Sequence, residues 1–149
     1  MHWGQEAQEV SSKLANIASV REEARGIVIA LPDTALFTAG RSTLKPSGKS
    51  KLNRVAAALA DGDGKILIEG HTDTNGDTNG SDRLSVGLSE RRAITVRNYL
   101  RERGISPDRM TAVGFGGARP LASNSTPQGR AKNRRVEIVV QVPATLSAG

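Results

Sequence analysis

Four short runs rich in β-branched residues alternate with two helical patterns, and this order limits the folds open to the chain. The predicted strands cover residues 26–31, 65–69, 109–115 and 136–142. Apolar residues recur at helical spacing over residues 46–59 and 84–103. The order βαβαββ predicts an α/β (α+β) fold, a two-layer sandwich with both helices on one face of a mixed sheet.

The segment before the first predicted strand has its own pattern. Val10, Leu14 and Ile17 lie near one face of a helix predicted over residues 5–25, which Gly26 ends. Because this apolar stripe is short, a linker is favoured over a coiled coil. The predicted organisation is an N-terminal helix or linker, a single domain and a flexible tail, over residues 1–25, 26–142 and 143–149.

Composition excludes several classes of protein. The chain of 149 residues has no cysteine, which excludes disulfide scaffolds, thiol nucleophiles and cysteine-based zinc sites. No apolar run approaches the ~20 residues that a membrane-spanning helix needs. Residues 1–5 lack the basic and apolar regions of a signal peptide, so either the chain is cytoplasmic or a targeting segment has been removed.

Charge is distributed unevenly along the chain. The formal net charge is +6, but acidic residues outnumber basic ones in residues 61–82, and basic residues outnumber acidic ones in residues 83–135. Outward-facing Arg91, Arg97 and Arg101 on the long helix make nucleic-acid binding an alternative function. Without interleaved aromatic residues or a recognised binding motif, the pattern favours solvated charge and no nucleic-acid partner.

One arginine of the long helix lies on its apolar face. At about 3.6 residues per turn, Arg92 lies one turn after Leu88 and one turn before Val96. A buried guanidinium is costly unless a carboxylate pairs with it. Arg92 is therefore expected to meet either a protein carboxylate, as an internal ion pair, or a ligand carboxylate.

A candidate partner for Arg92 follows the second predicted strand. Asp73 leaves the sheet at its carboxyl edge, where α/β sheets commonly bind ligands. A pocket with Asp73 on one side and Arg92 on the other would suit a zwitterion, such as the amino and carboxyl groups of one amino-acid centre.

Several blocks of sequence resemble the OmpA C-terminal-like (OmpA/MotB/Pal) domain family. They are ALFTAGRSTLKPSG, IEGHTDTNG, LSERRAITVRNYLRERGI and AVGFGGARPLASNSTPQGRAKNRRVEIVV, in the family order over roughly residues 26–142. The resemblance implies a non-enzymatic module without a cofactor. It implies non-covalent binding to peptidoglycan in the Gram-negative periplasm, with outer-membrane association through a missing N-terminal region. A purely structural envelope interaction is the alternative.

The resemblance also implies a set of site residues. In the family, an Asp of the HTD block and the Arg of the LSxxRA block grip the zwitterionic end of meso-diaminopimelate in the stem peptide. The corresponding residues here are Asp73 and Arg92. The expected pocket neighbours are Thr72, Thr74, Phe37, Thr38, Ala39, Gly40, Ser85, Asn133 and Arg134. Arg135 is expected to be a surface charge at the end of a strand.

Two features depart from the family pattern. Ser85 stands where the family usually has an asparagine, so one amide contact is shortened or lost. The loop after Asp73 is longer than usual and repeats the unit DTNG, which makes Asp77 a competitor for the role of Asp73.

Metal binding and catalysis are the remaining alternatives. The alternation over residues 73–81 resembles a calcium loop, but Thr78 and Leu84 stand where that loop needs glycine and glutamate, so no metal is predicted. His71 is expected to be a structural hydrogen-bonder, since no nucleophile elbow or pair of catalytic acids accompanies it. The sequence leaves open the oligomeric state and the type of parent protein.

Overall fold

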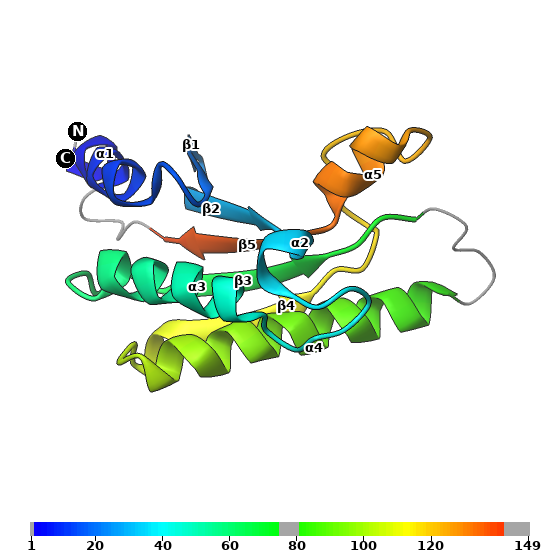
Figure 1. Ribbon diagram of the computed structural model, residues 1–149. Coiled ribbons are helices and arrows are strands. Elements are labelled where there is room, and N and C mark those ends of the chain that lie inside the picture. Colours follow the sequence, from blue (N-terminus) through cyan, green and yellow to red (C-terminus); the bar gives the residue numbers. More distant parts are fainter. Residues whose placement is uncertain (1, 75–80, 142–149) are drawn as a thin grey trace.

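Five strands form one mixed sheet in the order β1-β2-β5-β3-β4 (Figure 1). The computed structural model describes residues 2–74 and 81–141, and the strands are β1 (Ser19–Glu23), β2 (Gly26–Pro32), β3 (Ile66–His71), β4 (Met110–Gly114) and β5 (Arg135–Val140). The pair β3–β4 is parallel, and the other neighbours are antiparallel. The predicted α/β sandwich with a mixed sheet is confirmed, with one strand more than expected.

The described residues form five helices. They are α1 (His2–Leu14), α2 (Asp33–Leu36), α3 (Pro46–Leu59), α4 (Ser81–Glu102) and α5 (Pro127–Asn133), with a short 3₁₀ turn, η1 (Pro107–Arg109). α3 and α4 lie side by side, and α4 packs on β3 and β4 (Figure 1). Among the described residues, no helix has both the length and the apolar character needed to cross a membrane.

The helix predicted over residues 5–25 is wrong in its extent. α1 ends at Leu14, and β1 pairs with β2 through a tight turn at Ala24 and Arg25. Leu14 is fully buried in the same core as the sheet. β1 was not predicted from the sequence, because only one residue of this edge strand, Val20, is apolar and packs against the core.

The two faces of the sheet differ in chemistry. Ile29, Ile68 and Ile138 are neighbours across the three central strands and belong to the core beneath the helices. Their chain neighbours alternate to the opposite face, where Glu69 and Glu137 stand directly opposite each other on β3 and β5. The second face is therefore a buried surface that carries charge.

Two glycines let α4 lie close against the sheet. A Cβ on Gly70 would overlap the backbone carbonyl of Ser89, and a Cβ on Gly114 would overlap the backbone of Glu90. These contacts fix the middle of α4 over β3 and β4. The same part of α4 carries Arg92, so the close packing also sets the position of that guanidinium.

The carboxyl ends of two strands meet at one edge of the sheet. β2 and β3 both run antiparallel to β5, which lies between them, so they point in the same direction. Asp33 follows β2 directly, and Asp73 follows β3 after a single residue. Asp77 and the predicted tail at residues 143–149 lie outside the described residues.

Candidate functional site

Arg92 is buried at the base of a pocket, and its partner is Asp33. Its side chain is 5% exposed, and Nη1 lies 3.1 Å from Asp33 Oδ2. Nε donates to the backbone carbonyl of Arg41 at 2.9 Å, and the guanidinium carbon lies 4.9 Å from the centre of the Phe37 ring. The internal ion pair that was one expectation for Arg92 is present, but its carboxylate is Asp33, which was not an expected partner.

Asp73 lies in the same pocket and pairs with a second arginine. Arg134, whose side chain is 36% exposed, donates from Nη1 to Asp73 Oδ2, and its Nε lies 3.9 Å from Asp33 Oδ2. Carboxylates and guanidinium groups therefore alternate along the pocket in the order Asp73, Arg134, Asp33, Arg92. We call these four residues the pocket ion-pair chain.

The pocket has a volume of about 730 Å³. Of the residues expected there, those that line it are Phe37, Thr38, Ala39, Gly40, Thr72, Asp73, Ser85, Arg92 and Arg134. The lining residues that were not expected in the pocket are Asp33, Thr34, Lys45, Leu84 and Leu88. Acidic, basic and apolar side chains thus share one concave surface at the carboxyl edge of the sheet.

Thr72 brings a buried hydroxyl to this pocket. Its backbone N–H donates to the carbonyl of Gly116 at 2.9 Å, which ties the end of β3 to the loop after β4. Its Oγ1 is buried and has no hydrogen-bond partner among the described residues. A buried hydroxyl without a partner carries a free-energy cost that a polar ligand atom would relieve.

Two expected pocket residues do not line it. Asn133 is fully buried, and its side-chain amide bonds the backbone of Leu121 and Ala122 and the side chain of Asn124, so it holds the loop before α5. The backbone N–H of Thr74 faces the Asn124 side chain at 3.4 Å. Because the side-chain donors and acceptor of Asn133 all bond the loop before α5, Asn133 fixes the conformation of the chain beside the pocket.

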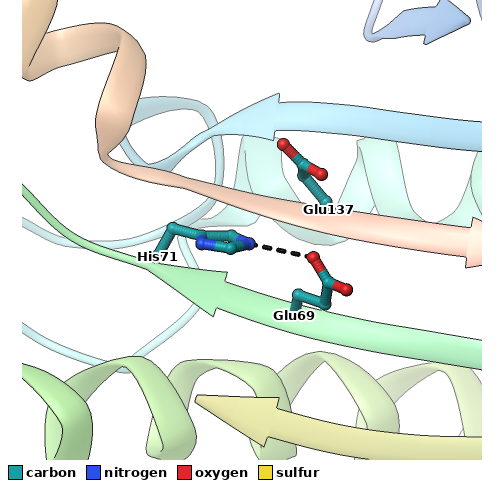
Figure 2. Close-up of side chains that lie close together, drawn as sticks. All are labelled: Glu69, His71 and Glu137. Carbon is teal, nitrogen blue, oxygen red and sulfur yellow. Dashed lines mark hydrogen bonds and ion pairs between the residues drawn. The ribbon is translucent and has the colours of Figure 1, made fainter. Parts of the chain in front are cut away.

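A second charged cluster occupies the opposite face of the sheet. Glu69, His71 and Glu137 lie close together (Figure 2). One possible ligating atom from each lies within 4.8 Å of the others. His71 Nε2 is 3.0 Å from Glu69 Oε1, and the His71 ring stacks on Phe115. These three residue types are possible metal ligands, although the sequence had suggested no metal site.

Guanidinium groups already meet these carboxylates. Arg25 donates to Glu69, and its Nη2 lies 2.6 Å from Glu137 Oε1. Arg135 Nε lies 2.7 Å from Glu137 Oε2. We call Arg25, Glu69, His71, Arg135 and Glu137 the buried network. Cations of the protein fill the place that a metal would need, which favours a structural role.

Electrostatics within the buried network keep Glu69 ionised. Burial alone would raise the pKa of Glu69, but hydrogen bonds from His71 and Arg25, together with the charge of Arg25, outweigh burial and lower that pKa below its ordinary value of 4.5. Arg135 was expected at the surface, and this expectation is wrong: its side chain is buried and also donates to the carbonyls of Asn133 and Arg119.

The arginines that had suggested nucleic-acid binding divide into two groups. Arg97, expected to face outward, is half-buried and donates to the carbonyls of Met110 and Pro107. Arg91 and Arg101 are exposed. Because the Arg97 guanidinium donates to backbone carbonyls of the protein, the α4 surface offers fewer guanidinium groups to a phosphate backbone than the sequence suggested.

Comparison with known proteins places the site in a family context. The model of the OmpA family matches residues 36–134. A protein of Mycobacterium tuberculosis named peptidoglycan-binding protein ArfA is 47% identical over 100 residues, which are 66% of this chain and 29% of that protein. Outer membrane protein A of Bordetella avium is 43% identical over 105 residues, which are 70% of this chain and 52% of that protein. The chain thus spans about half or less of the length of these relatives.

Solved structures show the same architecture. The cell wall anchor of the T6SS from Pseudomonas aeruginosa matches with a TM-score of 0.79 and 28% identity, over 92% of this chain and 96% of that one. The periplasmic domain of Helicobacter pylori MotB matches with a TM-score of 0.73 and 25% identity, over 88% of this chain and 86% of that one. Both matches extend over most of the fold that carries the pocket.

Proposed function

Because the chain belongs to the OmpA family, we propose that its pocket binds peptidoglycan without a covalent bond and anchors an envelope protein to the cell wall. The observation that carries this proposal is the pair of opposite charges, Asp73 and Arg92, in one pocket. Both residues lie in the segment that the family model matches. On this proposal the chain is a binding module and works in the periplasm, in association with the outer membrane of a Gram-negative cell.

The group that we propose for the pocket is the zwitterionic end of meso-diaminopimelate in the stem peptide. Asp73 would accept hydrogen bonds from the ligand ammonium, and Arg92 would donate to the ligand carboxylate. Asp33 and the Arg41 carbonyl already engage Nη1 and Nε of Arg92, so we assign Nη2 to the ligand. The unpartnered Thr72 hydroxyl supports a polar ligand, and the Phe37 ring supports one with an aliphatic chain.

Sedimentation with insoluble peptidoglycan tests this proposal. Asp73→Ala and Arg92→Ala should each weaken binding by about 2–5 kcal/mol, since Asp73→Ala leaves the ligand ammonium and Arg92→Ala leaves the ligand carboxylate without its partner in a desolvated site. Matched controls are Asp63→Ala and Arg101→Ala, which remove the same types of charge from exposed positions outside the pocket. The controls should sediment with the polymer as the parent protein does.

Circular dichroism must show that each variant is folded before its binding is interpreted. If folded Asp73→Ala and Arg92→Ala proteins sediment as well as the parent, the pocket does not hold the polymer and the proposal is wrong. Binding to DNA that falls steeply with salt and survives Asp73→Ala would instead support the nucleic-acid alternative.

A further inference from the structure

We propose that the ion pairs within the pocket hold the charged groups that a zwitterionic ligand would bind, and that such a ligand binds by exchange with one of them. The ligand ammonium takes the place of Arg134 at Asp73, and the ligand carboxylate balances the guanidinium that is released. This inference rests on the proposed function. It gives Arg134 and Asp33 roles in selecting the charge of the ligand.

The pocket ion-pair chain has one fixed arginine and one accessible arginine. Arg92 is almost fully buried and is held by Asp33, the Arg41 carbonyl and the Phe37 ring. Arg134 is about one third exposed, and its carboxylate contacts are with Asp73 and, at a longer distance, Asp33. Solvent-exposed ion pairs contribute little net free energy. The contact between Arg134 and Asp73 is therefore the one that a ligand can replace.

Asp33 is a second carboxylate that can pair with the Arg134 guanidinium after it leaves Asp73. Its Oδ2 lies 3.1 Å from Arg92 Nη1 and 3.9 Å from Arg134 Nε, so it lies between the two arginines. When Arg134 leaves Asp73, it remains beside Asp33 at the rim of the pocket. A ligand carboxylate that reaches Arg92 then lies close to Arg134 as well, and the alternation of charges continues through the ligand.

The charges that line the pocket make this exchange selective. Asp33 and Asp73 face Arg92, Arg134 and Lys45, whose Nζ donates to the Thr34 carbonyl at 2.7 Å. Cations thus already outnumber anions among the described lining residues. A ligand with an ammonium alone adds another positive charge and leaves Arg134 without a full partner, whereas a zwitterion adds no net charge.

Lysine and diaminopimelate differ in the feature that this exchange recognises. The side chain of lysine carries the ammonium of diaminopimelate without the adjacent carboxylate. A stem peptide with lysine would displace Arg134 and supply no anion in return. The pocket is therefore expected to discriminate against lysine-type stem peptides through Arg134, in addition to the contact that Arg92 makes with the ligand carboxylate.

Calorimetric titration with two synthetic stem tripeptides tests the exchange. One tripeptide carries meso-diaminopimelate at its third position, and the other carries L-lysine. The parent protein should prefer the diaminopimelate peptide by at least about tenfold. In Arg134→Gln the lysine peptide should bind roughly 5–10-fold more tightly than it binds the parent, because the Arg134 guanidinium no longer competes for Asp73.

Two further variants separate exchange from net charge. Lys132→Gln removes one positive charge from an exposed position of α5 and should keep the preference of the parent. Arg134→Lys keeps a cation opposite Asp73 and should restore the weak binding of the lysine peptide. Circular dichroism confirms that each variant is folded.

The outcomes distinguish this inference from the function on which it rests. If Arg134→Gln leaves the affinity for the lysine peptide unchanged or lowers it, while the parent binds the diaminopimelate peptide, the exchange is wrong and the proposed function stands. If neither the parent nor any variant binds either peptide, the proposed function fails, and the exchange fails with it.

Discussion

Arg134 and Arg135 are adjacent in the chain, yet they serve opposite sides of the sheet. Arg134 lies at the rim of the pocket, partly exposed, and pairs with Asp73. Arg135 begins β5 on the other face, where it is buried and pairs with Glu137. The same side-chain chemistry forms a pair that solvent can weaken on one side and a pair that water does not reach on the other.

The difference lies in how far each charge is from water. Glu137 has about 1% of its side chain exposed and is approached by Arg21, Arg25 and Arg135. Removing one member of such a cluster leaves a buried charge uncompensated, which costs several kcal/mol. The pocket ion-pair chain opens to solvent, so water can take over when a contact there breaks.

The largest expected effect comes from Arg135→Gln. This change should lower the free energy of unfolding by about 3–5 kcal/mol, because it leaves the buried Glu137 carboxylate without the Arg135 guanidinium. It also removes the hydrogen bonds from Arg135 to the carbonyls of Asn133 and Arg119. Urea unfolding followed by circular dichroism measures this loss. The protein that remains folded should still sediment with peptidoglycan.

Arg101→Gln is the matched control for this experiment, since it removes an exposed arginine from α4. Its unfolding free energy should stay close to that of the parent. If Arg135→Gln is as stable as this control, the buried network does not hold the sheet together, and the contrast between the two faces is lost.

Local patterns were sufficient to predict most of the fold. β2, β3 and β5 are rich in β-branched residues, and α3 and α4 have clear helical periodicity, so their order indicated the mixed sheet. β1 was not predicted because a short edge strand with three consecutive charged residues resembles an exposed helix face. Its position depends on pairing with β2, which no local pattern records.

Site residues could be predicted from the sequence only where the pattern of one continuous segment identified them. Arg92 was identifiable because a charge within an apolar helix face is anomalous by itself. Its partner Asp33 is 59 residues away, and the contact depends on how α4 packs on the sheet relative to the end of β2. Arg135 was misplaced because alternation along a strand does not reveal that a second face is also covered.

An intermediate effect is expected when acid protonates Glu69. Hydrogen bonds and the charge of Arg25 lower the pKa of Glu69 in the folded protein despite its burial. A carboxyl whose pKa is lower in the folded state stabilises the protein above its unfolded pKa, and this contribution disappears as pH falls through the folded pKa. The neutral acid can still hydrogen-bond, so the loss should be smaller than that from Arg135→Gln.

Unfolding free energies between about pH 7 and about pH 3 measure this contribution. Glu69→Gln should be less stable than the parent at neutral pH, and its stability should fall less steeply below about pH 4.5. Glu22→Gln, at an exposed position of β1, should follow the acid dependence of the parent. Equal slopes for Glu69→Gln and the parent would mean that Glu69 does not take part in the acid response.

The smallest effect is expected from Arg134→Gln in the absence of ligand. Because the contact of Arg134 with Asp73 is partly exposed, its loss should lower the free energy of unfolding by about 0–1 kcal/mol. About 1 M salt should remove most of that difference, since it screens exposed charges but not the pair of Arg135 with Glu137. Urea unfolding at low and high salt compares the two adjacent arginines directly.

A loss from Arg134→Gln that is as large as that from Arg135→Gln, and insensitive to salt, would mean that the pair of Arg134 with Asp73 stabilises the fold as the buried network does. Such a pair would not yield Asp73 to a ligand, so this result would overturn both the contrast between the two faces and the exchange that depends on it.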